Sequence, residues 1–211
     1  MKTIAENAVV TAEQFNASLF SQLFLVRIGV AAEEDFVGPA IQTPALSQFM
    51  TNRYDLLVTP DRLQISPKGE TDADRSNVIR DILVRIVEAL PHTPYMALGL
   101  NFVWVIEIDD PPTTSRRLFF KTGSVLEDEF DAPDARFGGY FSKDVFGARL
   151  RLNAKPVVLH PGETQHIQLD FNFDRKLPQD QPLEALREMI GHWDQVKEYA
   201  RRIATLINDA R

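Results

Sequence analysis

The sequence predicts an α+β fold, in which a mainly antiparallel, strongly twisted sheet carries two long helices on one face. Three observations support this prediction. The segment from Tyr95 to Asp109 is apolar on one face and half apolar on the other, which is typical of a central strand. Residues 165–174 alternate apolar with polar side chains, as a half-buried antiparallel strand does. Residues 74–90 and 182–208 repeat apolar side chains at helical spacing.

The chain has 211 residues, 44% of them hydrophobic and 25% charged, which suits one ordinary globular domain. Residues 1–10 are predicted to be a flexible tail, and residues 11–211 a single α+β domain. Thr11 and Gln14 have the spacing of a helix-capping box. Residues 23–30 contain enough β-branched and aromatic side chains to predict a strand. The alternative is a helix that continues from Thr11.

The first half of the chain contains a predicted hairpin followed by a helix. Strands at 54–59 and 62–67 are joined by Pro60 and Asp61, which suit a type I turn. Residues 74–90 follow as a helix that Pro91 ends, because the residue before a proline is disfavoured in the α region. Residues 31–51 show no period and are predicted to be mostly loop.

The half-apolar side of the 95–109 strand, with Val103 and Val105, must also be shielded from water. We expect either the N-terminal helix or a second copy of the chain to cover it. Further along, strands are predicted at 140–146 and 148–154, with Gly147 as a bulge between them. Residues 113–137 are the least readable segment, with a short helix expected around 116–122.

The chain is predicted to end in one helix from Pro182 to Asn208, roughly 40 Å long at ~1.5 Å per residue. Gly191 inside this helix suggests close backbone packing against the sheet. Each half of the chain then places a strand hairpin before a long helix, at 54–67 with 74–90 and at 148–174 with 182–208. This order suggests an internal duplication, although no motif recurs at matched positions.

Composition excludes several classes of function. The chain has no cysteine, which excludes disulfides, thiolate metal sites and a cysteine nucleophile. No apolar signal core opens the sequence and no apolar run approaches the ~20 residues of a membrane helix, so a cytoplasmic, soluble protein is expected without a membrane partner. The net charge of −7 makes nucleic acid an unfavourable partner.

One candidate site is a polar patch on the predicted strand at 165–174. His166 and Asp170 lie on its polar face, and Arg151 comes from the preceding strand. The functional interpretation is a cleft with a histidine base and carboxylates, as in a hydrolase or a small-molecule-binding protein. Cross-strand charge pairing of Arg149 and Arg151 with Asp170 and Asp174 is the structural alternative, and the one we favour.

No metal site, cofactor or reaction is predicted. Residues 170–174 match the opening of a calcium loop, but Arg175 replaces the required glycine and Gln181 the required glutamate. Phosphate-binding glycine loops, nucleophile elbows, zinc-protease helices and dinucleotide fingerprints are all absent from the sequence. The sequence therefore leans away from an enzyme.

A second candidate is the acidic segment 127–134, in which Phe130 follows Asp128 and Glu129. An aromatic residue within an acidic loop suits a contact with a protein partner. Asn101, in the middle of the apolar strand, is either a structural hydrogen-bonding residue or the polar anchor of a pocket. The preferred hypothesis is a non-enzymatic binding or assembly module that acts as an oligomer or complex subunit.

Two alternatives stay open. The first is the hydrolase or small-molecule-binding protein just described. The second is a single-stranded nucleic-acid binder that uses two small basic groups near aromatic residues. The first group consists of Arg116, Arg117 and Lys121, and the second of Arg149, Arg151 and Lys155.

Overall fold

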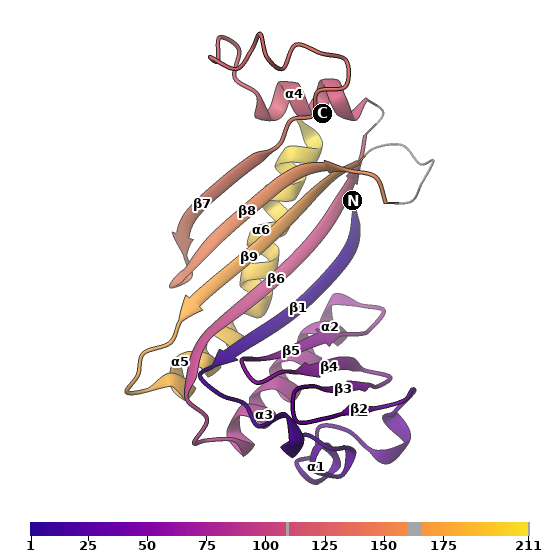
Figure 1. The fold of residues 1–211 in the computed structure, drawn as a ribbon, viewed down its shortest axis with the longest axis vertical. Coiled ribbons are helices and arrows are strands. Elements are labelled where there is room, and N and C mark those ends of the chain that lie inside the picture. The colour runs from indigo at the N-terminus through magenta and orange to yellow at the C-terminus, as the bar shows by residue number, and fades with distance from the viewer. Residues whose placement is uncertain (109, 160–165, 211) are drawn as a thin grey trace.

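The computed structural model describes residues 1–108, 110–159 and 166–210. Within these ranges one antiparallel sheet of nine strands runs in the order β2-β3-β4-β5-β1-β6-β9-β8-β7 (Figure 1). The strands are β1 (Lys2–Ala12), β2 (Ile41–Gln42), β3 (Ser47–Met50), β4 (Tyr54–Val58), β5 (Arg62–Pro67), β6 (Tyr95–Glu107), β7 (Gly139–Val145), β8 (Ala148–Val157) and β9 (His166–Lys176).

The helices lie on one face of this sheet, so the predicted α+β architecture is confirmed (Figure 1). They are α1 (Gln22–Arg27), α2 (Asp72–Val78), the π-helical turn η3 (Ile79–Leu83), α3 (Val84–Ala89), α4 (Pro111–Phe119), α5 (Pro182–Gly191) and α6 (Trp193–Asp209), with short 3-10 turns at η1 (Ala17–Leu19) and η2 (Glu33–Asp35). We call this side the helix face and the opposite side the open face. None of the helices in the described ranges is both long and apolar enough to span a membrane.

The β6 strand is central, as predicted, and pairs along its length with β1 and β9. Its apolar residues on the helix face, Phe102 and Trp104 among them, are buried. Trp193 at the start of α6 packs on Phe102, with ring centroids 4.8 Å apart. The predicted strand ended at Asp109, which lies outside the described residues. The core therefore sits between β6, its neighbours and the C-terminal helices.

The open face of β6 is not covered as predicted. No helix of the described ranges lies over this side of β1, β6, β9 and β8 in Figure 1. Val105 is nonetheless only 1% exposed, and its cross-strand neighbours are Lys2 on β1 and Gln168 on β9. Val103 on the same face is half-buried, so this face is shielded from water only in part.

The prediction of a flexible tail at residues 1–10 is wrong. These residues form most of β1, which lies between β5 and β6 in the middle of the sheet. Ala8 and Val10 point to the helix face and are fully buried. The local sequence contains Ala, Asn and Glu, which have weak strand propensity. The strand is therefore stabilised by its two neighbours rather than by its own preference.

Two other N-terminal expectations also fail. Thr11 is the second-to-last residue of β1 and does not start a helix. The predicted strand at 23–30 is mostly the short helix α1, whose first turn is capped by Ser21 through a hydrogen bond from the Phe24 backbone N–H at 3.1 Å. Gly29 follows with φ at 70°, a left-handed conformation that glycine adopts without strain. An apolar run this short cannot be assigned by periodicity alone.

The predicted terminal helix is divided at His192 into α5 and α6. Gly191 is exposed, and a Cβ added there would meet no atom within 4 Å. The expected close packing of Gly191 against the sheet is therefore absent. Instead, the break lets each helix keep its own apolar stripe on the sheet, and Met189 and Trp193 on its two sides are both fully buried. The low helix propensity of glycine favours a break at this position.

The hairpin and helix predicted in the first half are confirmed. β4 and β5 pair from Tyr54 with Pro67 to Val58 with Leu63. The helix runs through α2, η3 and α3 and begins at a capping box formed by Thr71 and Asp74. Its wide π turn lies inside the apolar stripe, where Ile79, Ile82 and Leu83 are buried.

The topology of the two halves repeats. In the first half, β1 is followed by a meander whose last strand, β5, returns beside β1 before α2 begins. In the second half, β6 is followed by a meander whose last strand, β9, returns beside β6 before α5 begins. β1 and β6 pair at the centre. The repeated unit is therefore larger than the predicted hairpin and helix, which supports the duplication hypothesis.

A buried ion cluster joins the two halves on the helix face. Lys197 on α6 is 3% exposed, and its ammonium donates to Glu6 of β1 at 2.7 Å and to Asp72 of α2 at 2.8 Å. The Arg75 guanidinium lies 3.2 Å from Glu6 and also pairs with Asp72. Arg201 pairs with the other oxygen of Asp72. Three cations therefore surround two carboxylates contributed by different elements.

The ion pairs of Asp72 make the free energy of unfolding depend on pH. Burial raises the pKa of Asp72, but hydrogen bonds from Lys197 and Arg201 outweigh it, and the net pKa lies well below its ordinary value. A carboxyl whose pKa is lowered by folding stabilises the protein above its unfolded pKa, about 4, and this stabilisation is lost as pH falls through the folded pKa. We expect the free energy of unfolding to decline below about pH 4, and less steeply in Asp72→Asn. Urea unfolding between pH 7 and pH 2 measures this.

The matched control is Asp134→Asn, which removes an exposed carboxylate with no ion pair in the described structure. This variant should retain the steep decline of the wild type. If Asp72→Asn and Asp134→Asn follow the same pH dependence, the cluster is not the origin of the acid sensitivity.

Candidate functional site

The predicted polar patch lies on the open face, where it forms a ladder of hydrogen bonds across four strands. Arg151 on β8 donates to the Asn172 side chain on β9 at 3.1 Å. Asn172 donates to Asn101 on β6 at 2.6 Å, and Asn101 donates to Asn7 on β1 at 2.8 Å. Asn101 is therefore a structural hydrogen-bonding residue, one of its two predicted roles.

The charges of this face are paired across strands, as the favoured alternative predicted, but not always with the expected partners. Arg151 lies 3.5 Å from Asp174, which confirms one predicted pair. Asp170 instead pairs with Lys155 at 3.3 Å and accepts a hydrogen bond from Gln168 at 2.6 Å. Arg149 pairs with Asp144 on the edge strand β7 at 3.1 Å. Such exposed pairs contribute about 0–1 kcal/mol each and leave few charges free for a ligand.

His166 is not brought together with Asp170. It lies at the first position of β9, opposite Glu107 and Val157 in the neighbouring strands. Four residues of strand separate it from Asp170, which corresponds to roughly 13 Å. In the described ranges, no three His, Asp or Glu side chains are grouped so that they could hold a metal ion. The geometry therefore does not join His166, Asp170 and Arg151 into one reaction centre.

The acidic segment connects α4 to β7. Phe130 is exposed, and its role as a contact residue stays a prediction. Arg116 on α4 lies 3.2 Å from Asp131 and 4.0 Å from Glu127, which ties the segment to the helix. Asp128 and Glu129 make no ion pair among the described residues. Two carboxylates next to an exposed aromatic ring are therefore available to a partner.

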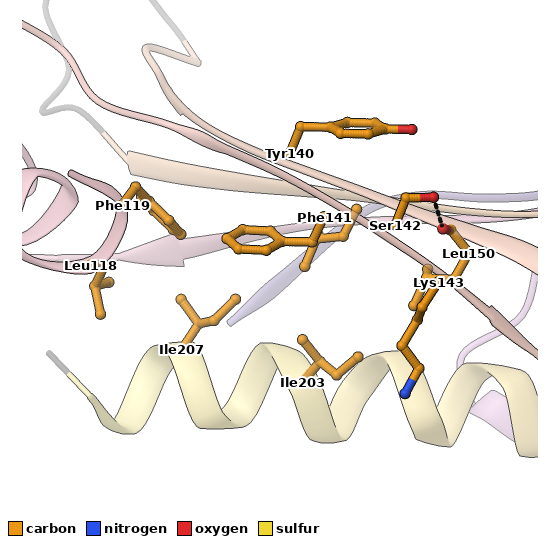
Figure 2. A pocket seen from close by; sticks show the side chains of 10 residues that line it. Leu118, Phe119, Tyr140, Phe141, Ser142, Lys143, Leu150, Ile203 and Ile207 are labelled. Carbon is orange, nitrogen blue, oxygen red and sulfur yellow. Dashed lines mark hydrogen bonds between the residues drawn. The ribbon is translucent and has the colours of Figure 1, made fainter. Parts of the chain in front are cut away.

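One concavity with a mainly apolar lining was not predicted from the sequence. It is an apolar groove of about 660 Å³ on the helix face, between α4, the edge strand β7 and the C-terminal half of α6. Figure 2 shows Phe119, Phe141, Ile203 and Ile207 converging on this space, whereas Tyr140 projects from the other face of β7. The remaining lining comes from Leu118, Ser142, Lys143, Leu150 and Leu152.

Local sequence explains how each element supplies this groove. In β7, alternate side chains point to opposite faces, so Phe141 and Lys143 share the helix face. In α6, Tyr199, Ile203 and Ile207 recur every four residues and form one stripe. The apolar stripe of α6 and the strand at 140–146 were recognised in the sequence. The groove could not be, because most of α4 lies in the least readable segment, 113–137, and no local pattern shows that β7 is an edge strand. Phe141 remains 51% exposed and Tyr140 65%.

The groove lies beside an open sheet edge. β7 pairs with β8 on one side, and no described strand pairs with its other side. The opposite edge of the sheet is β2, which is two residues long. A seven-residue strand with unpaired backbone groups is a template for another strand, whereas a very short edge strand is protected from such pairing.

Two cations flank the groove. The Lys143 ammonium and the Arg202 guanidinium both lie over the ring of Tyr199, at 5.3 Å and 4.9 Å from its centroid. In the described structure neither of them forms an ion pair, although the chain carries a net charge of −7. This end of the groove is therefore suited to negatively charged groups.

The sequence matches no protein-family model, and no curated protein matches it.

Proposed function

We propose that this protein is a non-enzymatic binding or assembly module that acts as an oligomer or complex subunit. Its docking site is the apolar groove beside β7. The observation that carries the proposal is the combination of an open seven-residue edge strand with an adjoining groove of about 660 Å³. This combination provides backbone hydrogen bonds and side-chain pockets in one place.

Strand addition is the binding mode that this geometry suits. An extended segment that pairs with a sheet edge gains affinity from main-chain hydrogen bonds and specificity from alternate side chains that enter pockets. Beside β7, every second side chain of an added strand would point to the helix face, toward Ile203 and Ile207. The others would lie on the open face, beside Tyr140.

Burial of the exposed aromatic residues would supply much of the driving force. Complete burial of a large apolar side chain stabilises a complex by roughly 1.5–3 kcal/mol, before the cost of association. Phe141 and Tyr140 are both more than half exposed, and they lie on opposite faces of the same strand. An added strand would therefore cover apolar surface on both sides of the sheet.

The observed charge pairing favours protein docking over nucleic-acid binding. Arg116, Arg149, Arg151 and Lys155 each have a carboxylate within 4.0 Å. A phosphate group would have to displace that carboxylate before it could bind. The hydrolase hypothesis lacks similar support, since His166, Asp170 and Arg151 do not line the groove.

Capture of partners with groove variants tests the proposal. Phe141→Asp places a charge in the groove and should abolish retention of the proteins that the wild-type chain captures from native lysate, a loss of at least about tenfold. Leu23→Asp is the matched control, because Leu23 is 77% exposed on α1 at the other end of the sheet. This control should retain every protein bound by the wild type.

Circular dichroism must first show that both variants are folded. If Phe141→Asp and Leu23→Asp capture the same proteins as the wild type, the groove is not the docking site. If the wild type captures nothing and does not self-associate, the assembly function itself is contradicted.

A further inference from the structure

We infer that the groove and edge of β7 are occupied by β7 of a second copy of this chain, paired antiparallel across a two-fold axis at Ser142. This inference rests on the proposed function and names its partner. The pairing would join two nine-stranded sheets into one continuous sheet.

The turn after β7 determines which backbone groups face the partner. Phe146 and Gly147, with φ of 54° and 67°, form a two-residue hairpin turn between Val145 and Ala148. The residues next to such a turn form a hydrogen-bonded pair, and bonded and non-bonded pairs alternate from there. The backbone groups of Phe141, Lys143 and Val145 therefore point to β8. Those of Tyr140, Ser142 and Asp144 point outward.

The self-pairing has one register that uses the whole strand. When Ser142 faces Ser142 of the other copy, each residue from Gly139 to Val145 has a partner within the same range. Tyr140 then faces Asp144 of the other copy in a hydrogen-bonded pair. A register centred on Asp144 or Lys143 would place like charges opposite each other, which is destabilising. A register centred on Phe141 would leave Asp144 and Val145 without partners in β7.

The side chains of this register are complementary on the helix face. Phe141 of each copy lies opposite Lys143 of the other, an arrangement in which an ammonium contacts an aromatic ring. The same face carries the groove, so the incoming Phe141 and Lys143 extend the sheet beside Ile203 and Ile207 of α6. The exposed ring of Phe141 is thereby covered in both copies.

Charge complementarity also favours a second copy. The acidic segment 127–134 lies just before β7 in the chain. Antiparallel pairing places the start of β7 in one copy beside the end of β7 in the other. It therefore brings the carboxylates of Asp128 and Glu129 toward the end that carries Lys143 and Arg202. Neither of these cations has a carboxylate partner in the described part of a single chain, where both lie over the ring of Tyr199.

Cysteine cross-linking tests the register, because the natural chain has no cysteine. In Ser142→Cys the two thiols would lie on facing residues, whose Cα atoms are about 5.5 Å apart in a hydrogen-bonded pair and within disulfide range. Tyr140→Cys is the matched control on the same strand face. The two cysteines at position 140 would lie four strand positions apart, or roughly 14 Å, which is too far for a disulfide.

With diamide as the oxidant, which takes two electrons and two protons from each thiol pair, we expect Ser142→Cys to form covalent dimers. The initial rate should be at least about tenfold higher than for Tyr140→Cys. Sedimentation of the wild type at micromolar concentration should give twice the chain mass of 23.9 kDa.

Ser142→Pro supplies the complementary test. It removes an outward N–H, and proline is tolerated at such a position in an edge strand. This variant should sediment as a monomer, whereas Ser142→Thr, which keeps the N–H, should remain a dimer. A wild-type dimer that persists in Ser142→Pro, or equal cross-linking of the two cysteine variants, would place the interface elsewhere and overturn the inference.

A monomeric wild type would also overturn it. The proposed docking function would then stand or fall separately, on whether Phe141→Asp loses the proteins captured from lysate. Failure of self-pairing and failure of the docking function are therefore distinguishable.

Discussion

Deletion of residues 1–10 is expected to leave no folded protein, although the sequence predicts that these residues are a flexible tail. They form most of β1, which pairs with β5 on one side and β6 on the other. Without β1, the sheet would divide between β5 and β6 and expose the backbone edges of both strands. Thermal unfolding monitored by circular dichroism measures this loss, and the deleted chain should show no cooperative transition.

Two adjacent point variants make the same test within the full-length chain. Val10 points to the helix face and is fully buried, whereas Val9 lies on the open face between Gln64 and Gly99. Val10→Asp buries an unpaired carboxylate, at a cost of several kcal/mol out of a total stability of about 5–15 kcal/mol. Val9→Asp leaves its carboxylate in contact with water and should cost less than about 1.5 kcal/mol.

Urea unfolding of the two variants measures this difference. Equal stabilities for Val9→Asp and Val10→Asp, or a folded protein after deletion of residues 1–10, would show that β1 is not an integral strand. The predicted tail would then be correct after all.

Lys197→Ala is expected to destabilise the protein by about 3–5 kcal/mol, because it breaks a buried ion pair. The side chains of Lys197 and Glu6 are 4% and 2% exposed, so the lysine is a buried partner of a buried carboxylate. Removal of Lys197 leaves the charge of Glu6 buried with Arg75 alone beside it. It also removes one of the cations that hold Asp72 of α2.

The double variant Glu6→Leu/Lys197→Met is the informative control. Replacement of both partners of a buried ion pair by apolar residues is often neutral or stabilising, because neither charge has to be desolvated. The double variant should therefore be more stable than Lys197→Ala, as measured by urea unfolding. If the double variant is the less stable of the two, the cluster has a role that simple desolvation does not describe.

Elements with strong internal patterns could be predicted from the sequence. The long apolar run of β6, the clean alternation of β9 and the helical period of residues 72–89 each determine one structure, because only one arrangement buries their apolar side chains. The hairpin of β4 and β5 was equally readable, since Pro60 and Asp61 define its turn. Part of the candidate site followed as well, because alternation placed Arg151 and Asp174 on one face.

Elements that depend on distant partners could not be predicted. β1 has a weak local preference for strand and is stable because β5 and β6 lie on either side of it. The groove is assembled from α4, β7 and α6, and nothing in the sequence of α4 indicates that it will face residues nearly ninety positions further along. A lysine is normally expected at the surface. Lys197 is buried because β1 and α2 pack against α6 around it.

The sequence by itself therefore determined the fold class, the central strand β6 and the core-facing side of the strongly patterned elements, which are β6, β9 and the long helical segments. These properties follow from side-chain periodicity, which acts between neighbours in the chain. Only the tertiary structure decided that β1 is also central and that β7 is an edge, which charges are buried, and where an apolar groove remains open. Those properties depend on the order in which strands pair, and that order is set by the burial of surfaces that are far apart in the sequence.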